Sequence, residues 1–199
     1  HMARMDPSYV ATFSAEEIRC HAVLADQLDQ ERLAQVDAAP LADGRWRVTI
    51  VAYDYPGELS LICGLLFVYG VTIDDGDVFT YEPQAALTSR HDARRKIVDV
   101  FTVTPVRHRV TPETWQRYQE DLTALLRLMQ SGRRREAQGE LAKRVAAALH
   151  DVTGTSNALY PVEIEIDNDA SAHYTVLRIR ALDTIGFLYE FTNALALTG

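Results

Sequence analysis

The sequence predicts an α+β fold in which helices cover an antiparallel sheet. Segments with apolar residues at every second position, the period of a strand with one buried face, recur along the chain. Segments with apolar residues every three or four positions, typical of helices, lie between them. The 199 residues, 47% hydrophobic and 24% charged, supply enough apolar material for the core of one or two domains.

A helix is predicted near the N-terminus, over residues 14–33. Ser14 and Glu17 have the spacing of a capping box, in which the two side chains satisfy free backbone N–H groups at a helix start. The apolar residues that follow fall on one helix face, namely Ile18, Ala22, Ala25 and Leu28. The stretch 37–44 contains Pro40 and an Asp-Gly pair, which predicts a linker or turn, and we place a domain boundary after residue 44.

A strand, a turn and a helix follow from residue 45. Trp46, Val48 and Ile50 alternate with polar residues, until Asp54-Tyr55-Pro56-Gly57 breaks the strand. The helix that follows is expected to end at Gly70. It is apolar on all its faces, although packing on one side of a sheet requires only one apolar stripe. We therefore expect a second surface, from elsewhere in the chain or from another copy, to cover it.

Further strands and helices are predicted after residue 70. Strands are expected at 71–81, with a bulge or bend at Gly76, and at 96–104, separated by a polar turn at 82–94. Two helices follow, the first opened by Pro112. Their buried stripes are Trp115, Tyr118, Leu122, Leu125, Leu126 and Met129 in the first, and Ala137, Leu141, Val145 and Ala148 in the second.

The last predicted elements are two short strands. Val162, Ile164 and Ile166 alternate with acidic residues, as in a strand with one buried face, and 174–182 predicts another strand. From residue 45 onward the order is therefore strand, helix, two strands, helices, strand. This βαββαβ order predicts a ferredoxin-like sandwich with an antiparallel sheet.

The chain also contains a partial internal repeat. Shifting it by 129 residues, from 54 to 183, places Asp183 on Asp54 and Gly186 on Gly57. The second copy contains only a strand and a helix, which by themselves cannot complete a sheet. We expect this half to be completed by the rest of a longer protein or by association with another chain.

Composition and motifs exclude several functions. Cys20 and Cys63 cannot form a disulfide framework or a thiolate zinc site and are interpreted as reduced thiols. The net charge of −8 argues against nucleic acid as a partner, and no apolar run approaches the ~20 residues that span a membrane. No signal peptide is recognised, so we expect a cytoplasmic protein, and His1-Met2 resembles the remnant of an affinity tag. No catalytic residue, metal ligand or cofactor is predicted.

The loop Asp54-Tyr55-Pro56-Gly57-Glu58-Leu59 matches the Asp-x-Pro-Gly-x-Leu hallmark of the ACT domain, a small ligand-sensing βαββαβ module. The chain resembles in particular the tandem ACT pair at the C-terminus of bacterial PII uridylyltransferase/uridylyl-removing enzymes, whose second copy is preceded by a stretch similar to residues 162–177. The resemblance implies a tag remnant, helix and linker over 1–44, a first ACT domain with a helical insertion over 45–168, and half of a second over 169–199.

In that family the ACT pair senses glutamine and sets the balance between adding UMP to the PII protein and removing it. The resemblance implies that this chain is a non-catalytic, glutamine-sensing part of a nucleotidyltransferase, with a homodimer or an intramolecular ACT–ACT pair as its assembly. The alternative is an ACT-type dimerisation or interaction module that binds no small ligand. Thr72, where the family has Asn, and Ile185, in place of the loop proline, favour that alternative.

The loop that ends at Gly57 has the chemistry to hold an amino acid. Free N–H groups at a helix start suit a carboxylate, and a glycine lets a ligand approach the backbone. Asp54 would either accept a hydrogen bond from an ammonium group or simply cap the helix. The predicted ligand-binding residues are Asp54, Tyr55, Pro56, Gly57, Glu58, Leu59, Thr72, Ile73, Asp183 and Gly186.

Overall fold

The computed structural model describes residues 5–81, 95–106, 109–150, 161–171, 174–182, 184 and 186–198. The polar turn expected at 82–94, and Asp183, Ile185 and Gly199 of the second repeat, lie outside this part of the chain.

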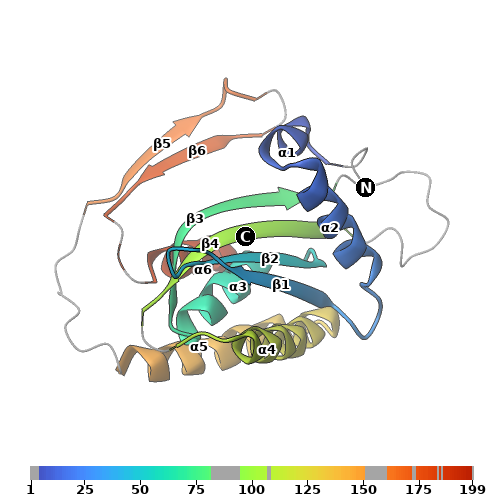
Figure 1. Ribbon diagram of the computed structural model, residues 1–199. Coiled ribbons are helices and arrows are strands. Elements are labelled where there is room, and N and C mark those ends of the chain that lie inside the picture. Colours follow the sequence, from blue (N-terminus) through green and yellow to red (C-terminus); the bar gives the residue numbers. More distant parts are fainter. Residues whose placement is uncertain are drawn as a thin grey trace.

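The main sheet has four antiparallel strands in the order β1-β2-β4-β3, so the predicted α+β class with an antiparallel sheet is confirmed. The strands are β1 (Ala34–Pro40), β2 (Trp46–Tyr53), β3 (Val71–Thr80) and β4 (Lys96–Pro105). Figure 1 shows three helices below this sheet: α3 (Glu58–Val68), α4 (Pro112–Gln130) and α5 (Arg134–His150). The ferredoxin-like assignment itself stays a prediction.

The sheet departs from the predicted order at its fourth strand. The strand expected at 162–166 is not part of it, and the place beside β2 is taken by β1, paired from Ala34↔Ala52 to Pro40↔Trp46. The linker prediction for 37–44 was therefore wrong for residues 37–40. A hairpin joins β1 to β2 through a short turn, and closing a short loop costs less chain entropy than bringing back a distant segment. Strand pairing thus crosses the predicted boundary after residue 44.

The two short strands expected near the C-terminus form a separate hairpin. β5 (Glu163–Asp167) pairs with β6 (Val176–Arg180) in a two-stranded sheet, which stands apart from the main sheet in Figure 1. The expected burial of one face of β5 was wrong, because the side chains of Ile164 and Ile166 are 57% and 65% exposed. No other element of the described chain covers that face. Helix α6 (Phe187–Thr198) follows β6.

The second face of the main sheet is covered by the N-terminal helices α1 (Pro7–Thr12) and α2 (Ala15–Asp26). An ion pair of 2.9 Å between Arg47 Nη2 and Glu17 Oε1 joins β2 to α2. As a result β2 is buried on both faces, whereas its alternating pattern predicted one buried face. Helix α2 also ends at Asp26 rather than at residue 33.

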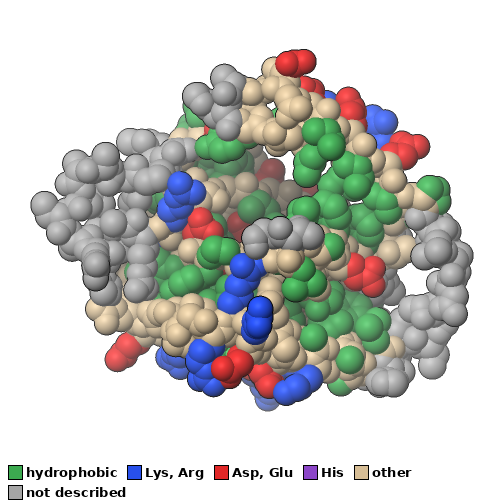
Figure 2. All heavy atoms as spheres, turned by 180° about the vertical axis from the view of Figure 1, so that it is seen from behind, with side chains coloured by type: hydrophobic (Ala, Val, Ile, Leu, Met, Phe, Trp, Pro, Cys, Tyr) green, Lys and Arg blue, Asp and Glu red, His purple; other side chains and the backbone are tan. Residues whose placement is uncertain are grey.

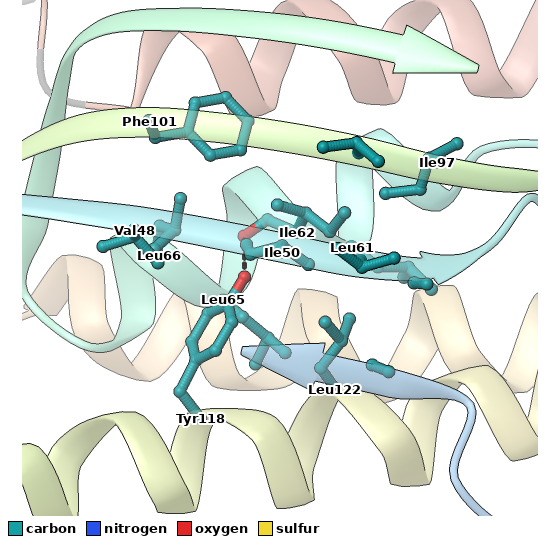
Figure 3. Packing of buried hydrophobic residues seen from close by; sticks show 14 of the residues in the cluster. Val48, Ile50, Leu61, Ile62, Leu65, Leu66, Ile97, Phe101, Tyr118 and Leu122 are labelled. Atoms are coloured by element: carbon teal, nitrogen blue, oxygen red, sulfur yellow. Dashed lines mark hydrogen bonds between the residues drawn. The ribbon is translucent and has the colours of Figure 1, made fainter. Parts of the chain in front are cut away.

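The main core lies between the sheet and α3. Figure 3 shows side chains of β2, β4, α3 and α4 meeting there, and the Tyr118 hydroxyl of α4 donates a hydrogen bond of 3.1 Å to the Ile62 carbonyl. The buried stripes predicted for α4 and α5 are confirmed. Helix α3 is covered by α4, α5 and α6 on the sides that do not face the sheet. The second covering surface expected for this all-apolar helix therefore comes from the same chain.

The bulge predicted at Gly76 is displaced within β3. The pairing register with β4 shifts between Ile73 and Asp75, so the irregularity lies at Asp74. Gly76 has a different role, because a Cβ atom there would lie 2.5 Å from the Phe101 ring. The glycine makes room for a core side chain of the neighbouring strand.

The capping box of α2 provides a test of the N-terminal packing. Ser14 Oγ accepts a hydrogen bond from the Glu17 N–H, and the Glu17 carboxylate accepts one from the Ser14 N–H. We expect Ser14→Ala to lower the free energy of unfolding by about 1 kcal/mol, because it leaves a backbone donor unpaired. Ser14→Asn, which preserves the acceptor, should have little effect. Urea denaturation of both variants measures the difference, and equal losses would contradict the capping role.

Candidate functional site

The predicted loop lies at the start of α3, and its geometry leaves that helix end open. Gly57 is the N-cap residue with a φ of 88°, a left-handed conformation that favours glycine. No side chain caps this helix, so Asp54 does not act as its cap. The Glu58 N–H donates to the Tyr55 carbonyl at 2.9 Å. The rest of the first turn presents backbone donors of the kind that bind carboxylates.

A cavity of about 370 Å³ opens beside this loop, and we call it the α3 cavity. Small-molecule sites in proteins commonly have volumes of about 300–1,000 Å³. All six predicted residues of the loop, 54–59, line the cavity. The remaining walls come from β3, β4 and α6, and consist mainly of Val78, Thr80, Ile97, Asp99, Thr192 and Leu195. The corner therefore opens on the cavity, although Ala196 and the Arg134 guanidinium pack against it at Gly57.

Two acidic side chains of the α3 cavity are almost completely buried. Glu58 is 4% exposed and Asp99 is 1% exposed. Within the described part of the chain, Glu58 Oε1 and Asp99 Oδ1 have no hydrogen-bond partner. Burial raises the pKa of both carboxyls well above its usual range, and the negative charge of Asp54 raises both further. Neither carboxylate has a counter-ion in the described cavity wall.

Sequence reasoning missed Asp99. It lies in the middle of a predicted strand whose other residues are mostly apolar. The available signal was its spacing, because Asp99 lies two positions from both Ile97 and Phe101. In a strand this spacing places its carboxyl on the same face as these two core residues. A charged residue at such a position is unusual in a core, because its burial is costly unless it has a partner.

A second cavity of about 350 Å³ lies at the start of α6, and we call it the α6 cavity. Thr72, Ile73 and Gly186 line this cavity, together with Thr184, Phe67 and Tyr189. Of the predicted loop residues only Leu59 reaches both cavities. The predicted set is thus divided between two places, because β3 passes the start of α6 after leaving the end of α3.

The two cavities are related by the internal repeat. A Cβ on Gly57 would lie 3.1 Å from Ala196 Cβ, and a Cβ on Gly186 would lie 3.3 Å from the Phe67 ring. Ala196 and Phe67 are themselves equivalent under the shift of 129 residues, from 67 to 196. Each helix therefore begins against the end of the other, and α3 and α6 pack antiparallel about a local two-fold axis.

The repeat extends further than the sequence indicated. The same shift places β5 on residues 34–38 and β6 on residues 47–51, so both copies consist of a hairpin, a loop and a helix. The face that carries α6 is hollowed between the β5–β6 hairpin and the main body, and hydrophobic side chains gather on both sides of the hollow (Figure 2).

Other site types find no support in the described residues. They contain no group of three or more His, Cys, Asp or Glu side chains placed to hold a metal ion. None of their helices combines the length and apolar character needed to cross a membrane. Cys20 and Cys63 are both free thiols, the first exposed and the second buried.

No family model matches the chain. It is similar to curated bifunctional uridylyltransferase/uridylyl-removing enzymes from three bacteria. The identity is 30% over 198 residues in Azospirillum brasilense, covering 98% of this chain and 19% of the relative. It is 30% over 149 residues in Rhodopseudomonas palustris, covering 75% and 14%. It is 29% over 194 residues in Gluconobacter oxydans, covering 96% and 18%. The chain spans less than a fifth of these relatives, and the similarity supports the predicted family.

Proposed function

We propose that the chain is a regulatory, ACT-type segment of a uridylyltransferase-like nucleotidyltransferase that binds glutamine. The observation that carries the proposal is the α3 cavity, which is lined by the complete loop 54–59 at a helix start without a side-chain cap. The similarity of nearly the whole chain to bifunctional uridylyltransferase/uridylyl-removing enzymes supports its parentage.

The walls of the α3 cavity suit a zwitterion of the size of an amino acid. Backbone donors in the first turn of α3 would hold the ligand carboxylate, with the positive end of the helix dipole behind them. Acidic side chains that line the same cavity, Asp54 among them, would hold the ammonium group. Apolar side chains between them, including Ile97 and Leu195, would contact the carbon atoms of the ligand.

The position of the cavity between the two repeats suits regulation. Its walls come from the first repeat and from α6 of the second, so a bound ligand contacts both. Such a ligand binds more tightly when α6 is packed on α3 than when it is not. That difference in affinity is what allows a ligand to shift a conformational equilibrium. We propose that the α3–α6 contact is the intramolecular ACT–ACT pairing.

Calorimetric titration with glutamine tests this function. We expect saturable binding, weakened about 10- to 100-fold in Asp54→Ala, because a hydrogen bond to a charged group contributes about 1.5–3 kcal/mol. Asp26→Ala, an exposed aspartate at the end of α2, is the matched control and should bind like the original chain. Absence of heat with glutamine, under conditions where the chain is folded, would contradict the proposal.

A second candidate function is an interaction module that binds no small ligand. The exposed side chains of Ile164 and Ile166 on the β5–β6 hairpin favour it, because apolar side chains on one strand face suit burial against another surface. Sedimentation velocity distinguishes the two functions. A tight dimer whose stability no amino acid changes would support the interaction module over the sensor.

A further inference from the structure

We propose that Glu58 and Asp99 together form the receptor for the ammonium group of the ligand in the α3 cavity. This inference rests on the proposed function and names the two side chains that recognise the amine.

Asp99 is placed in the cavity by the centre of the sheet. It lies on β4 between Ile50 of β2 and Val78 of β3, to which it is paired. Its neighbours on the same strand face, Ile97 and Phe101, point towards α3 in Figure 3. Asp99 is 1% exposed, and its Oδ1 atom has no hydrogen-bond partner among the described residues.

Glu58 approaches the same cavity from the first turn of α3. Its backbone is fixed by the hydrogen bond to the Tyr55 carbonyl, and its side chain is 4% exposed. Its Oε1 atom, like Asp99 Oδ1, is buried without a partner. Glu58 and Asp99 line the same cavity, and the proximity of Asp99 contributes to the raised pKa of Glu58.

The unpaired oxygens of Glu58 and Asp99 favour a cation as their partner. An unpaired buried polar group costs about 1–3 kcal/mol, so two of them in one cavity require a compensating donor. None of the described residues that line the cavity is Lys, Arg or His. The described chain has no cluster of ligands for a metal ion. A primary ammonium group offers three N–H donors and satisfies both free oxygens at once.

The two buried acceptors also determine which ligands the α3 cavity should bind. A site that buries two unpaired acceptors should reject a ligand that lacks the amine, because binding would then leave both acceptors without water and without a donor. We expect glutamine to bind at least 10-fold more tightly than glutaramic acid, which is glutamine without its amino group. The same acceptors should also give the chain a weak affinity for a simple amine such as propylamine.

The experiment compares three probes on the intact chain by calorimetry at pH 7: glutamine, glutaramic acid and propylamine. Each is titrated into the original sequence, Asp99→Asn and Glu58→Gln. Asp77→Asn is the matched control for the strand, because Asp77 pairs with Val100 and therefore faces the opposite side of the sheet. Glu113→Gln is the matched control for the helix, because Glu113 is an exposed acid in the first turn of α4.

The expected result is a loss of at least 10-fold in glutamine and propylamine affinity in Asp99→Asn and Glu58→Gln, with both controls unchanged. The inference is overturned if glutamine and glutaramic acid bind equally, or if the two cavity variants bind glutamine like the original chain. Those results would leave the proposed function standing. If glutamine does not bind, the proposed function fails, and propylamine binding lost in Asp99→Asn still supports the receptor. No binding of either amine overturns both.

Discussion

Gly64→Leu is expected to separate α6 from α3 and to lower the free energy of unfolding by about 1–3 kcal/mol. Gly64 lies on the side of α3 that faces α5 and α6. A Cβ atom there would lie 2.7 Å from Leu141 Cδ2 and 2.8 Å from Tyr189 Cδ2. These distances are shorter than van der Waals contact, so a larger side chain must push α6 or α5 away. Urea denaturation measures the loss, and amide hydrogen exchange shows whether the α6 amides lose protection first.

Gly139→Ala is the matched control, because Gly139 is also a helical glycine. A Cβ at position 139 of α5 would have no heavy atom within 4 Å. This substitution should raise the free energy of unfolding by about 0.5–1 kcal/mol, since alanine loses less backbone entropy than glycine in a helix. A Gly64→Leu variant as stable as the original chain would show that α6 is not closely packed on α3. The proposed coupling between the repeats would then have no structural basis.

The free energy of unfolding is expected to fall as the pH rises above about 5, because of the buried acid pair. In the unfolded chain the carboxyls of Asp99 and Glu58 titrate near their ordinary values of 3.8 and 4.5. Burial raises the pKa of both in the folded chain. Between the unfolded and the raised pKa values the folded chain binds more protons, so stability is present at lower pH and is lost as the pH rises.

One other described group titrates in this range. Burial lowers the pKa of His21, so between this lowered value and its ordinary value of 6.5 the unfolded chain binds more protons and stability rises with pH. The Asp29 carboxyl, which accepts hydrogen bonds from Arg32, has its pKa lowered to about 2 and titrates at more acidic pH. Burial raises the pKa of the Cys63 thiol and of the Tyr118 hydroxyl, so both stay neutral. A fall in stability between pH 5 and 8 is therefore assigned to the acid pair, because His21 contributes in the opposite direction.

Asp99→Asn separates this contribution from the rest of the protein. We expect the variant to be more stable than the original chain at pH 8, by about 1–3 kcal/mol, because it removes an unpaired buried charge. At pH 4, where the carboxyl is protonated, the difference should disappear. Thermal or urea unfolding across this range, with Asp77→Asn in parallel, gives the measurement. If the stability of the original chain does not change with pH, or if Asp99→Asn is less stable than the original chain at pH 8, the acid pair does not destabilise the folded protein.

If Asp99→Asn gains stability and loses amine binding, it behaves as expected for a substitution at a binding-site residue. Binding sites often retain groups that destabilise the empty protein, and their removal stabilises the fold at the expense of function. A structural role for Asp99 predicts the opposite, since removing a stabilising group lowers stability.

The sequence by itself determined the features that depend on neighbouring residues. The capping box at Ser14, the buried stripe of α4 and the loop before α3 were all predicted, because each results from side chains a few positions apart. The requirement that a second surface cover α3 also followed from sequence, since a helix that is apolar on every face cannot remain exposed.

The tertiary structure decided which distant surfaces meet. The edge strand of the sheet is β1 and not residues 162–166. Thr72 and Ile73 lie at the start of α6, and Asp99 lines the α3 cavity. A residue's pattern of neighbours in the chain shows which of its faces is apolar or charged. It does not show what that face packs against, because this depends on competition among all surfaces for burial and for strand pairing.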